Sequence, residues 1–280
     1  MAALIIDAAA MNDSPASLLI DPFRLQALLG DACGRFDVDS LAECESTNTL
    51  LLSRADQGAP AGSVIVTDRQ TAGRGSRGRS WLASPESSLT FSVLWRFDGG
   101  LERLSGLSLA VGIAVVHALE ASGAVGVKLK WPNDILYGNA KLGGILVELQ
   151  GASESALAVI GIGLNLRLPE HPVTGAAFAM PPSALDQIVA PLPERHALFA
   201  QLLIELARVF DRFSDGGFAS LRQQWQARHA WQDRPVRLLR DGRVEKEGLC
   251  RGADSDGALL VQTEAGVERC LSGDLSLRIL

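Results

Sequence analysis

The chain has 280 residues, of which 47% are hydrophobic and 21% charged, and its formal net charge is −6. This length allows one large domain, alone or with a small one, and the composition is that of a globular protein, which argues against disorder over most of the chain. The acidic balance disfavours nucleic acid as a partner, because phosphate contacts require a basic face. The 4 cysteines form no CxxC pair, which is typical of reduced thiols in a cytoplasmic protein.

Residues 1–39 are expected to form a leader and a first helix, partly disordered. Residues 1–17 lack the basic start and the long apolar core of a signal peptide, and the true start is either Met1 or Met11. No apolar run approaches the ~18–20 residues needed to cross a bilayer. We therefore expect a cytoplasmic protein with no membrane partner.

The first half of the chain predicts helices and strands around a basic loop. Residues 40–52 begin with turn formers and become apolar, which predicts a helix capped by Ser46. Residues 63–67 and 88–95 are rich in β-branched and apolar side chains and predict two strands. Residues 102–121 are apolar on most faces, so they predict a buried helix.

The middle of the chain predicts three more strands. Residues 125–131 alternate, with four apolar side chains on one face and Lys128 and Lys130 on the other. A Pro-Asn-Asp turn ends this strand, and residues 145–149 and 157–164 predict two core strands.

The last third of the chain changes character twice. Residues 169–195 are rich in proline and alanine and predict a connector, after which residues 196–214 and 217–230 predict two amphipathic helices. Short β-like runs separated by turn signals follow, which predicts a small antiparallel barrel of about 45 residues. The expected domains are therefore residues 40–232 and 233–280.

The strongest local signal is the segment at residues 73–81, GRGSRGRSW. Four arginines and no acid lie between Arg69 and Arg79. Glycine lets the backbone approach a ligand closely, and arginine offers forked donors to phosphate or carboxylate oxygens. The segment predicts an anion-binding loop, with a solvated loop or a nucleic-acid patch as alternatives. It is not a phosphate loop of the GxxxxGK[ST] type.

Two further segments carry polar groups at strand ends. In KWPND at residues 130–134 and KLGGIL at residues 141–146, a strand ends, turns and returns with a lysine on each side. Lysine can offset charge on an α-phosphate, and aspartate can hold magnesium or orient an amine. An exposed hairpin is the alternative. GIGLN at residues 161–165 is either a tightly packed strand end or a nucleotide contact.

In combination and in order, these motifs resemble those of the biotin–protein ligase family, in a short form without an N-terminal DNA-binding domain. The matching residues are 46–48 (STN), Gln70, 73–81, 130–134, 141–148 (KLGGILVE), 161–165 and 273–278 (GDLSLR). The resemblance covers residues 40–280. It implies an α+β fold, with a class II synthetase-like mixed β-sheet, flanking helices and a small C-terminal Src-homology-3-like β-barrel.

The resemblance also implies a two-step reaction. The carboxylate of biotin attacks the α-phosphate of MgATP to give biotinyl-5'-AMP, and a lysine of a biotin carrier protein then takes the biotinyl group. The implied carrier is the subunit of acetyl-CoA carboxylase or of a similar carboxylase. ATP and Mg²⁺ are expected as co-substrate and metal, without a permanently bound cofactor, and the protein as a monomer or weak homodimer.

Site residues follow from the matching positions. The implied catalytic residues are Lys141, which would bridge the biotin carboxylate and the α-phosphate, and Lys130, Asp134 and Arg74. The residues expected to bind biotin are Ser46, Thr47, Asn48, Gln70, Gly73, Arg74, Gly75, Lys141, Gly144 and Ile145. The residues expected at the nucleotide are Arg77, Arg79, Trp81, Lys130, Asn133 and Asn165, with Asn165 also the candidate metal contact.

One position departs from the resembled pattern. Ser76 stands where the family usually has an arginine that the resemblance associates with holding the adenylate. The predicted consequence is faster escape of the adenylate, unless Arg77 compensates. Three other functions remain open from the sequence: a lipoate–protein ligase, a transcriptional regulator with biotin as co-repressor, and a non-catalytic binding module.

Overall fold

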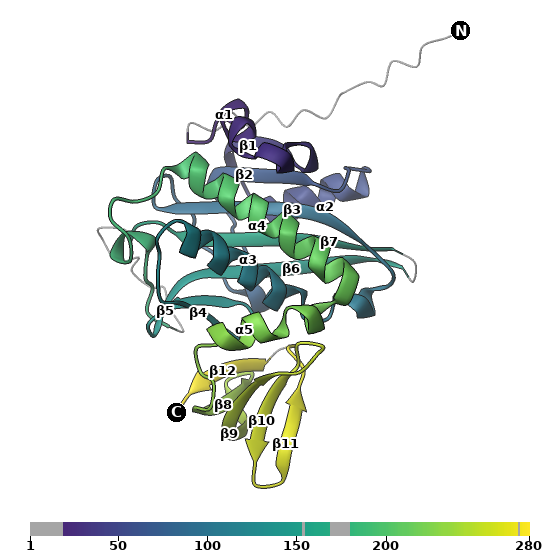
Figure 1. Cartoon of the computed structure of the whole chain (residues 1–280), viewed down its shortest axis with the longest axis vertical. Coiled ribbons are helices and arrows are strands. Elements are labelled where there is room, and N and C mark those ends of the chain that lie inside the picture. Colours follow the sequence, from purple (N-terminus) through teal and green to yellow (C-terminus); the bar gives the residue numbers. More distant parts are fainter. Residues whose placement is uncertain (1–18, 153–154, 169–179, 274) are drawn as a thin grey trace.

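The computed structural model describes residues 19–152, 155–168, 180–273 and 275–280. The leader predicted at residues 1–17 and part of the 169–195 connector lie outside these ranges. The described residues form a seven-stranded mixed sheet and, below it in Figure 1, a five-stranded antiparallel sheet.

In the large sheet only the first two strands are parallel, and the other neighbours are antiparallel. In sheet order the strands are β1 (Asp37–Cys44), β2 (Ser63–Gln70), β3 (Ser88–Asp98), β7 (Ser155–Asn165), β6 (Ala140–Ala152), β5 (Asp134–Tyr137) and β4 (Val127–Lys130). In the small sheet they are β11 (Gly266–Cys270), β10 (Leu259–Thr263), β9 (Arg243–Ala253), β8 (Pro235–Arg240) and β12 (Leu275–Ile279).

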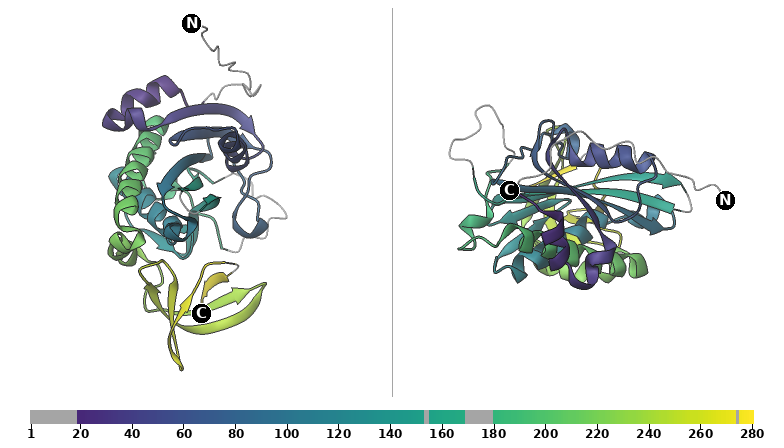
Figure 2. Two further views of the ribbon diagram at one scale, coloured as in Figure 1. Left: turned by 90° about the vertical axis from the view of Figure 1, so that its right-hand side faces the viewer. Right: turned by 90° about the horizontal axis from the view of Figure 1, so that it is seen from above.

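Helices cover both faces of the large sheet (Figure 2). The α-helices are α1 (Pro22–Leu28), α2 (Thr47–Asp56), α3 (Leu107–Ala121), α4 (Arg195–Gly216) and α5 (Arg222–Arg228). Short 3₁₀ turns are η1 (Gly30–Arg35), η2 (Ser76–Gly78), η3 (Leu101–Leu104), η4 (Leu185–Gln187) and η5 (Phe218–Ser220). The main core lies between the sheet and α3 with α4, and a smaller core lies under α2 on the opposite face.

The turn predicted at the start of residues 40–52, before the helix capped by Ser46, is wrong. Residues up to Cys44 belong to β1, because Leu41 and Cys44 are buried against α2 and the sheet. The helix begins at Thr47, and Ser46 caps it by accepting a hydrogen bond from the Thr49 N–H at 3.5 Å. The cap signal was therefore correct, but the turn formers before it lie in a strand.

The helix predicted at residues 102–121 is α3 preceded by η3. By length and composition Leu101–Ala121 would suffice to cross a membrane, contrary to the sequence expectation that no run approaches that length. In this structure the apolar side chains of α3 are buried against α4 and the sheet. A helix buried in the core of a folded protein has the same length and apolar composition as a membrane-spanning helix, and α3 is buried in this way.

Two side chains of the strand predicted at residues 125–131 differ from expectation. Val125 precedes β4 and is 77% exposed. Lys130 is on the expected face, but its side chain is only 2% exposed. It is buried because an acidic partner lies beside it, as described below.

Candidate active site

The face of the large sheet that carries α2 is lined by small residues where β3, β7 and β6 run side by side. The register pairs Thr90 with Gly163, Gly163 with Gly144, and Gly144 with Asp134 on β5. We call these four residues the small-residue strip. The next position on β3, Phe91, points to the other face and packs on α4. Alternation along a strand thus leaves space above the sheet on the α2 side.

Trp81 lies over this strip. Its indole Nε1 donates a hydrogen bond to Thr90 Oγ1 at 3.2 Å. A Cβ added at Gly163 would lie 2.3 Å from the indole, so any side chain there would displace the ring. A Cβ at Gly144 would lie 3.1 Å from Lys141 Nζ and 3.9 Å from the Trp81 ring. The arginine-rich loop, through Trp81, therefore adjoins the lysine region.

The loop itself encloses a cavity. Residues 70–82, together with Leu146 of β6, line a volume of about 500 Å³. The Trp81 N–H donates to the Gly73 carbonyl at 2.8 Å, and a Cβ at Gly73 would lie 2.2 Å from the Trp81 carbonyl oxygen. This close approach requires glycine. The cavity reaches Trp81, but neither Lys130 nor Lys141 is among its lining residues.

Ser76 holds a neighbouring arginine of this loop. Its hydroxyl accepts from Arg79 Nη2 at 2.9 Å, and its carbonyl accepts from Arg79 Nε at 3.2 Å. Arg77 has a left-handed backbone, with φ of 60°, and an exposed side chain. Arg77 and Arg79, the two arginines expected at the nucleotide, thus both line the cavity, and Ser76 orients Arg79.

Buried polar side chains link α2 to the sheet beside the cavity. The Thr47 N–H donates to Gln70 Oε1 at 2.8 Å, and the Thr47 hydroxyl donates to the same oxygen at 3.2 Å. The Ser92 hydroxyl lies 2.7 Å from Thr47 Oγ1 and 2.6 Å from Asn48 Oδ1. Ser46 is buried and used as the helix cap. Of the predicted biotin contacts from this region, Gln70 is the one that lines the cavity.

A carboxylate joins this network to the loop. Glu148 Oε2 accepts from Asn48 Nδ2 at 2.9 Å, and Oε1 accepts from Arg74 Nη2 at 2.8 Å. Arg74 Nη1 also donates to Thr49 Oγ1 at 3.3 Å. Glu148 therefore links α2 to the arginine-rich loop.

Two lysines share one carboxylate at the end of the strip. Lys130 Nζ and Lys141 Nζ each lie 2.5 Å from a different oxygen of Asp134. The Asp134 and Lys130 side chains are 4% and 2% exposed, whereas that of Lys141 is 26% exposed. Lys141 is thus the lysine that a ligand can reach without rearrangement.

Lys130, Asp134 and Lys141 form a triad, and the burial of Lys130 and Asp134 shifts their pKa values. Desolvation lowers the pKa of Lys130 to about 8, although the charge of Asp134 opposes it. Desolvation acts to raise the pKa of Asp134, but the two lysine charges outweigh it and hold that pKa well below its usual value. Burial and the charge of Arg79 lower the pKa of Arg278, and the charge of Asp134 raises it. Arg278 is therefore near enough to Arg79 of the loop and to Asp134 of the triad to feel the charge of both.

Two predicted nucleotide residues have structural partners. Asn165 Nδ2 donates to the carbonyls of Lys141 and Ser183, at 3.3 and 3.0 Å. Asn133 Nδ2 donates to the Ile145 carbonyl at 2.8 Å. Both asparagines therefore fix the backbone around the lysines, and their predicted ligand contacts stay predictions. Within the described residues no three His, Cys, Asp or Glu side chains are grouped as a metal site.

Some residues of the site had no role assigned from the sequence. Ser92 and Thr90 are ordinary strand residues, Gly163 lay in the GIGLN motif without a role of its own, and only the register between distant strands brings them together. Glu148 and Arg278 ended two of the motifs but received no role. A period-two pattern of small residues on β3 and β7 would have been the signal to find the strip.

Comparison with known proteins gives the same picture. Residues 41–165 match the Biotin/lipoate A/B protein ligase family, and residues 233–278 match the Biotin protein ligase C terminal domain. The chain is 34% identical to the Bifunctional ligase/repressor BirA of Escherichia coli K12, over 93% of this chain and 80% of the relative. It is 33% identical to the Biotin--[acetyl-CoA-carboxylase] ligase of Paracoccus denitrificans, over 81% of this chain and 94% of the relative.

The chain belongs to the biotin protein ligase family. A solved biotin protein ligase from Aquifex aeolicus, in complex with biotin and ATP, has 29% identity and a TM-score of 0.74, over 87% of this chain and 99% of that one. The family and the α+β fold, with its large mixed sheet and small C-terminal β unit, are therefore confirmed. The division at residues 232 and 233 and the role of each site residue stay predictions.

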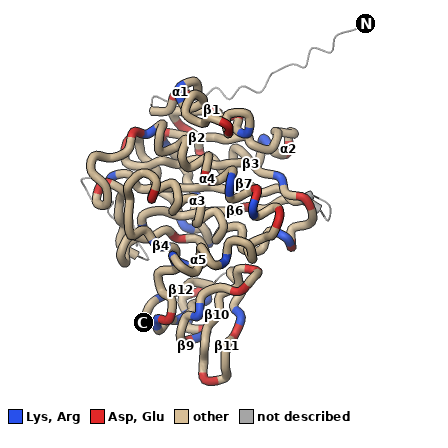
Figure 3. The backbone as a smooth tube through the Cα atoms, in the orientation of Figure 1, with Lys and Arg blue, Asp and Glu red and all other residues tan. Residues whose placement is uncertain are grey.

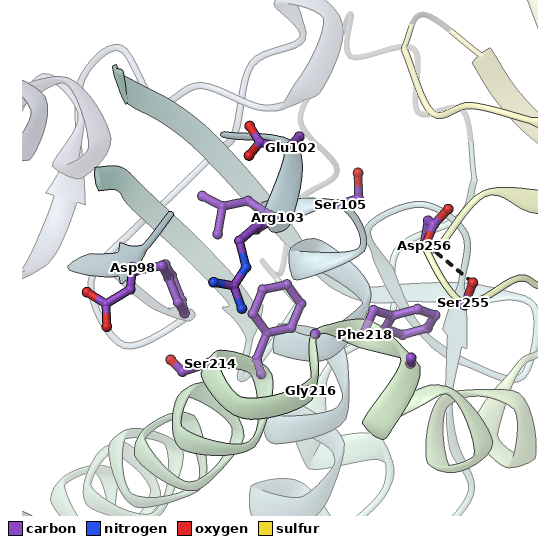
Figure 4. Close-up of a pocket in the computed structure, with 14 residues that line it drawn as sticks. Asp98, Glu102, Arg103, Ser105, Ser214, Gly216, Phe218, Ser255 and Asp256 are labelled. Carbon is purple, nitrogen blue, oxygen red and sulfur yellow. Dashed lines mark hydrogen bonds between the residues drawn. The ribbon is translucent and has the colours of Figure 1, made fainter. Parts of the chain in front are cut away.

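A second cavity lies outside the candidate active site. It has a volume of about 410 Å³ and lies between η3, the end of α4 and the turn that carries Asp256. Figure 4 shows charged and hydroxyl side chains there, among them Arg103, Asp98 and Ser255. No residue predicted from the family motifs lines it.

Proposed function

We propose that this protein is a biotin–protein ligase that forms biotinyl-5'-AMP from biotin and MgATP at the α2 face of the large sheet and transfers the biotinyl group to a carrier lysine. The observation that carries the proposal is the meeting of Trp81 and Lys141 over Gly144. In a chain whose relatives are biotin ligases, this contact supports the proposal that the arginine-rich loop binds the anionic groups of the substrates beside a reachable lysine.

The geometry supports a division of roles. Gln70 lines the cavity, and its amide oxygen is held by Thr47, so its amide nitrogen is oriented as a donor for the ureido oxygen of biotin. The arginines of the loop offer charge-assisted hydrogen bonds to the carboxylate and phosphate. Gly73 and Gly75 let the loop backbone approach the ligand, and Gly144 and Ile145 supply the strand along which it lies.

Lys141 is proposed as the residue that stabilises charge in the first step. When the biotin carboxylate oxygen attacks the α-phosphorus, negative charge builds on the phosphate oxygens until pyrophosphate leaves. A fixed ammonium at that point stabilises the transition state more than the ground state. Asp134 holds this ammonium in place at 2.5 Å. Mg²⁺ enters as part of the substrate MgATP.

In the second step the ε-amine of the carrier lysine attacks the carbonyl carbon of the mixed anhydride, and AMP leaves. The amine attacks in its uncharged form, having lost its ammonium proton to solvent, and the proton released on acyl transfer also passes to solvent. Asp134, the one carboxylate of the triad, contributes by holding Lys141 in place. The proposed carrier is the biotin carrier subunit of acetyl-CoA carboxylase or of a similar carboxylase. The proposed setting is the cytoplasm, with the enzyme a monomer or weak homodimer.

Mass spectrometry of a purified candidate carrier tests the whole proposal. After incubation with enzyme, biotin and MgATP, one carrier lysine should gain one biotinyl group, and omission of ATP should abolish the product. Lipoate in place of biotin is the matched competitor. Modification by lipoate but not by biotin would contradict the proposal.

DNA binding is the second candidate function, because the Escherichia coli relative is named a ligase and repressor. We expect no specific DNA binding here. Figure 3 shows acidic and basic residues interspersed along the described chain, and the net charge is −6. Gel retardation at moderate salt, with and without biotin and ATP, measures this directly, and a specific shift would contradict the expectation.

A further inference from the structure

Lys130 is enclosed by groups from two different parts of the chain. Its ammonium lies 2.5 Å from Asp134 on one side and 5.4 Å from the centroid of the Trp231 ring on another. Both Lys130 and Trp231 are buried. A cation over the face of an aromatic ring is attracted by the ring's electrons, and more strongly so where water is excluded.

Trp231 is fixed on both sides by the segment that leads to the C-terminal sheet. The backbone of His229 bridges Leu129 of β4, and the Ala230 N–H donates to the Leu129 carbonyl at 2.8 Å. Beyond the ring, the Asp233 N–H donates to the Cys250 carbonyl of β9 at 2.8 Å. The backbone on either side of Trp231 is therefore tied to both sheets, and the buried indole lies at their junction.

The position of Lys130 determines whether one or both carboxylate oxygens of Asp134 can bind Lys141. Each carboxylate oxygen now serves one lysine, so Lys141 is held by one oxygen and remains 26% exposed beside Gly144. If the Lys130 ammonium left its place, both oxygens would be free to hold Lys141. The Lys141 ammonium would then be drawn toward the buried carboxylate and away from the bound substrates.

We propose that Trp231 is a positioning residue for adenylate formation, which holds the Lys130 ammonium against Asp134 so that Lys141 stays directed at the substrates. This role rests on the proposed biotin-activating function. It makes the junction with the C-terminal sheet part of the machinery of the first step, although Trp231 itself touches no substrate.

The test is biotin-dependent exchange of pyrophosphate into ATP by the full chain. Trp231→Leu removes the ring face, and we expect kcat to fall about tenfold with the KM for biotin changed less than twofold. Trp231→Phe keeps an aromatic face, so this variant should retain most of the wild-type kcat. Equal losses in the Leu and Phe variants would overturn the proposal.

Two controls separate positioning from general damage. Trp225 is buried in the same region and stacks on His229, but its ring is not the one over Lys130. Trp225→Leu should therefore lower thermal stability without the selective loss of kcat, and the same kcat loss in that variant would contradict us. In a Lys130→Met background, Trp231→Leu should cause little further loss of kcat, because the partner of the ring is already gone. An additive loss in that double variant would overturn the proposal.

The outcomes also separate this inference from the proposed function. If the wild-type enzyme shows no biotin-dependent exchange, the proposed function fails and so does the inference that rests on it. If the wild type is active and Trp231→Leu keeps its full kcat, only the role of Trp231 is wrong.

Discussion

At the scale of single residues, exposure separates two lysines that the sequence could not distinguish. Lys130 and Lys141 both flank Asp134 and both matched the family motif, so both were predicted to be catalytic. The structure leaves Lys141 reachable and encloses Lys130. The lysines and the aspartate could be predicted because each lies in a local motif, whereas Ser92 and Glu148 could not, because their roles depend on strands far apart in sequence.

Replacing Lys141 by alanine should lower kcat for adenylate formation by roughly 10²–10³, because the charge on the α-phosphate loses its fixed cation. Single-turnover formation of biotinyl-5'-AMP measures this step. Lys128→Ala is the matched control, since Lys128 is exposed on β4, which β5 separates from the β6 strand of Lys141. A loss below tenfold at Lys141 would mean that its role is assigned wrongly.

Ser76 leads to a second prediction at this scale. The serine orients Arg79 but supplies no charge of its own, and a charge-assisted hydrogen bond to the adenylate contributes roughly 1.5–3 kcal/mol. We expect the wild-type enzyme to release adenylate and biotinylate an unrelated lysine-rich protein, and Ser76→Arg to label it less. Equal labelling by the two enzymes would show that Ser76 does not make the intermediate escape.

At the scale of elements, the alternation of the central strands builds the site. The buried strands β2, β3 and β7 could be predicted from apolar runs, but β1 was missed because its half-exposed residues resemble a turn. The small-residue strip depends on which strand lies beside which, and that information lies in the register. The loop was predicted as an anion-binding element, while its contact with the sheet through Trp81 was not.

Gly163→Ala tests the fit of the loop to the sheet. The added methyl group would lie 2.3 Å from the Trp81 indole, so the ring and the loop that carries it must shift. We expect biotin and ATP to bind at least tenfold more weakly by calorimetry, with a small change in thermal stability. Gly34→Ala is the control, because no atom lies within 4 Å of its added Cβ. Unchanged affinities in Gly163→Ala would exclude Trp81 as part of the pocket.

At the scale of the whole molecule, the two sheets meet beside the lysine triad. The Trp131 indole donates to the Gly257 carbonyl at 3.0 Å, and Arg278 of β12 is influenced by the charge of Asp134. The small β unit could be predicted from its turn spacing and its resemblance to the family. Its contact with the site could not, because the residues that meet are more than a hundred positions apart.

Acid should weaken this junction through His229. Burial lowers the pKa of His229 to about 4. Between the unfolded value near 6.5 and this folded value, only the unfolded chain binds the proton, so stability falls as pH drops through that window. This residue should contribute about 3 kcal/mol of the loss. Denaturant unfolding at pH 7.5 and 4.5 should show a smaller loss in His229→Phe than in the wild type, and identical losses would contradict the assignment.

The central claim is that the loop and Lys141 activate biotin with ATP on this sheet face. The most direct measurement is the rate at which labelled pyrophosphate enters ATP, recorded with and without biotin for the wild type and Lys141→Ala. We predict exchange that requires biotin, is not supported by lipoate, and is almost lost in the variant. Exchange that proceeds equally without biotin, or equally in Lys141→Ala, would contradict the account.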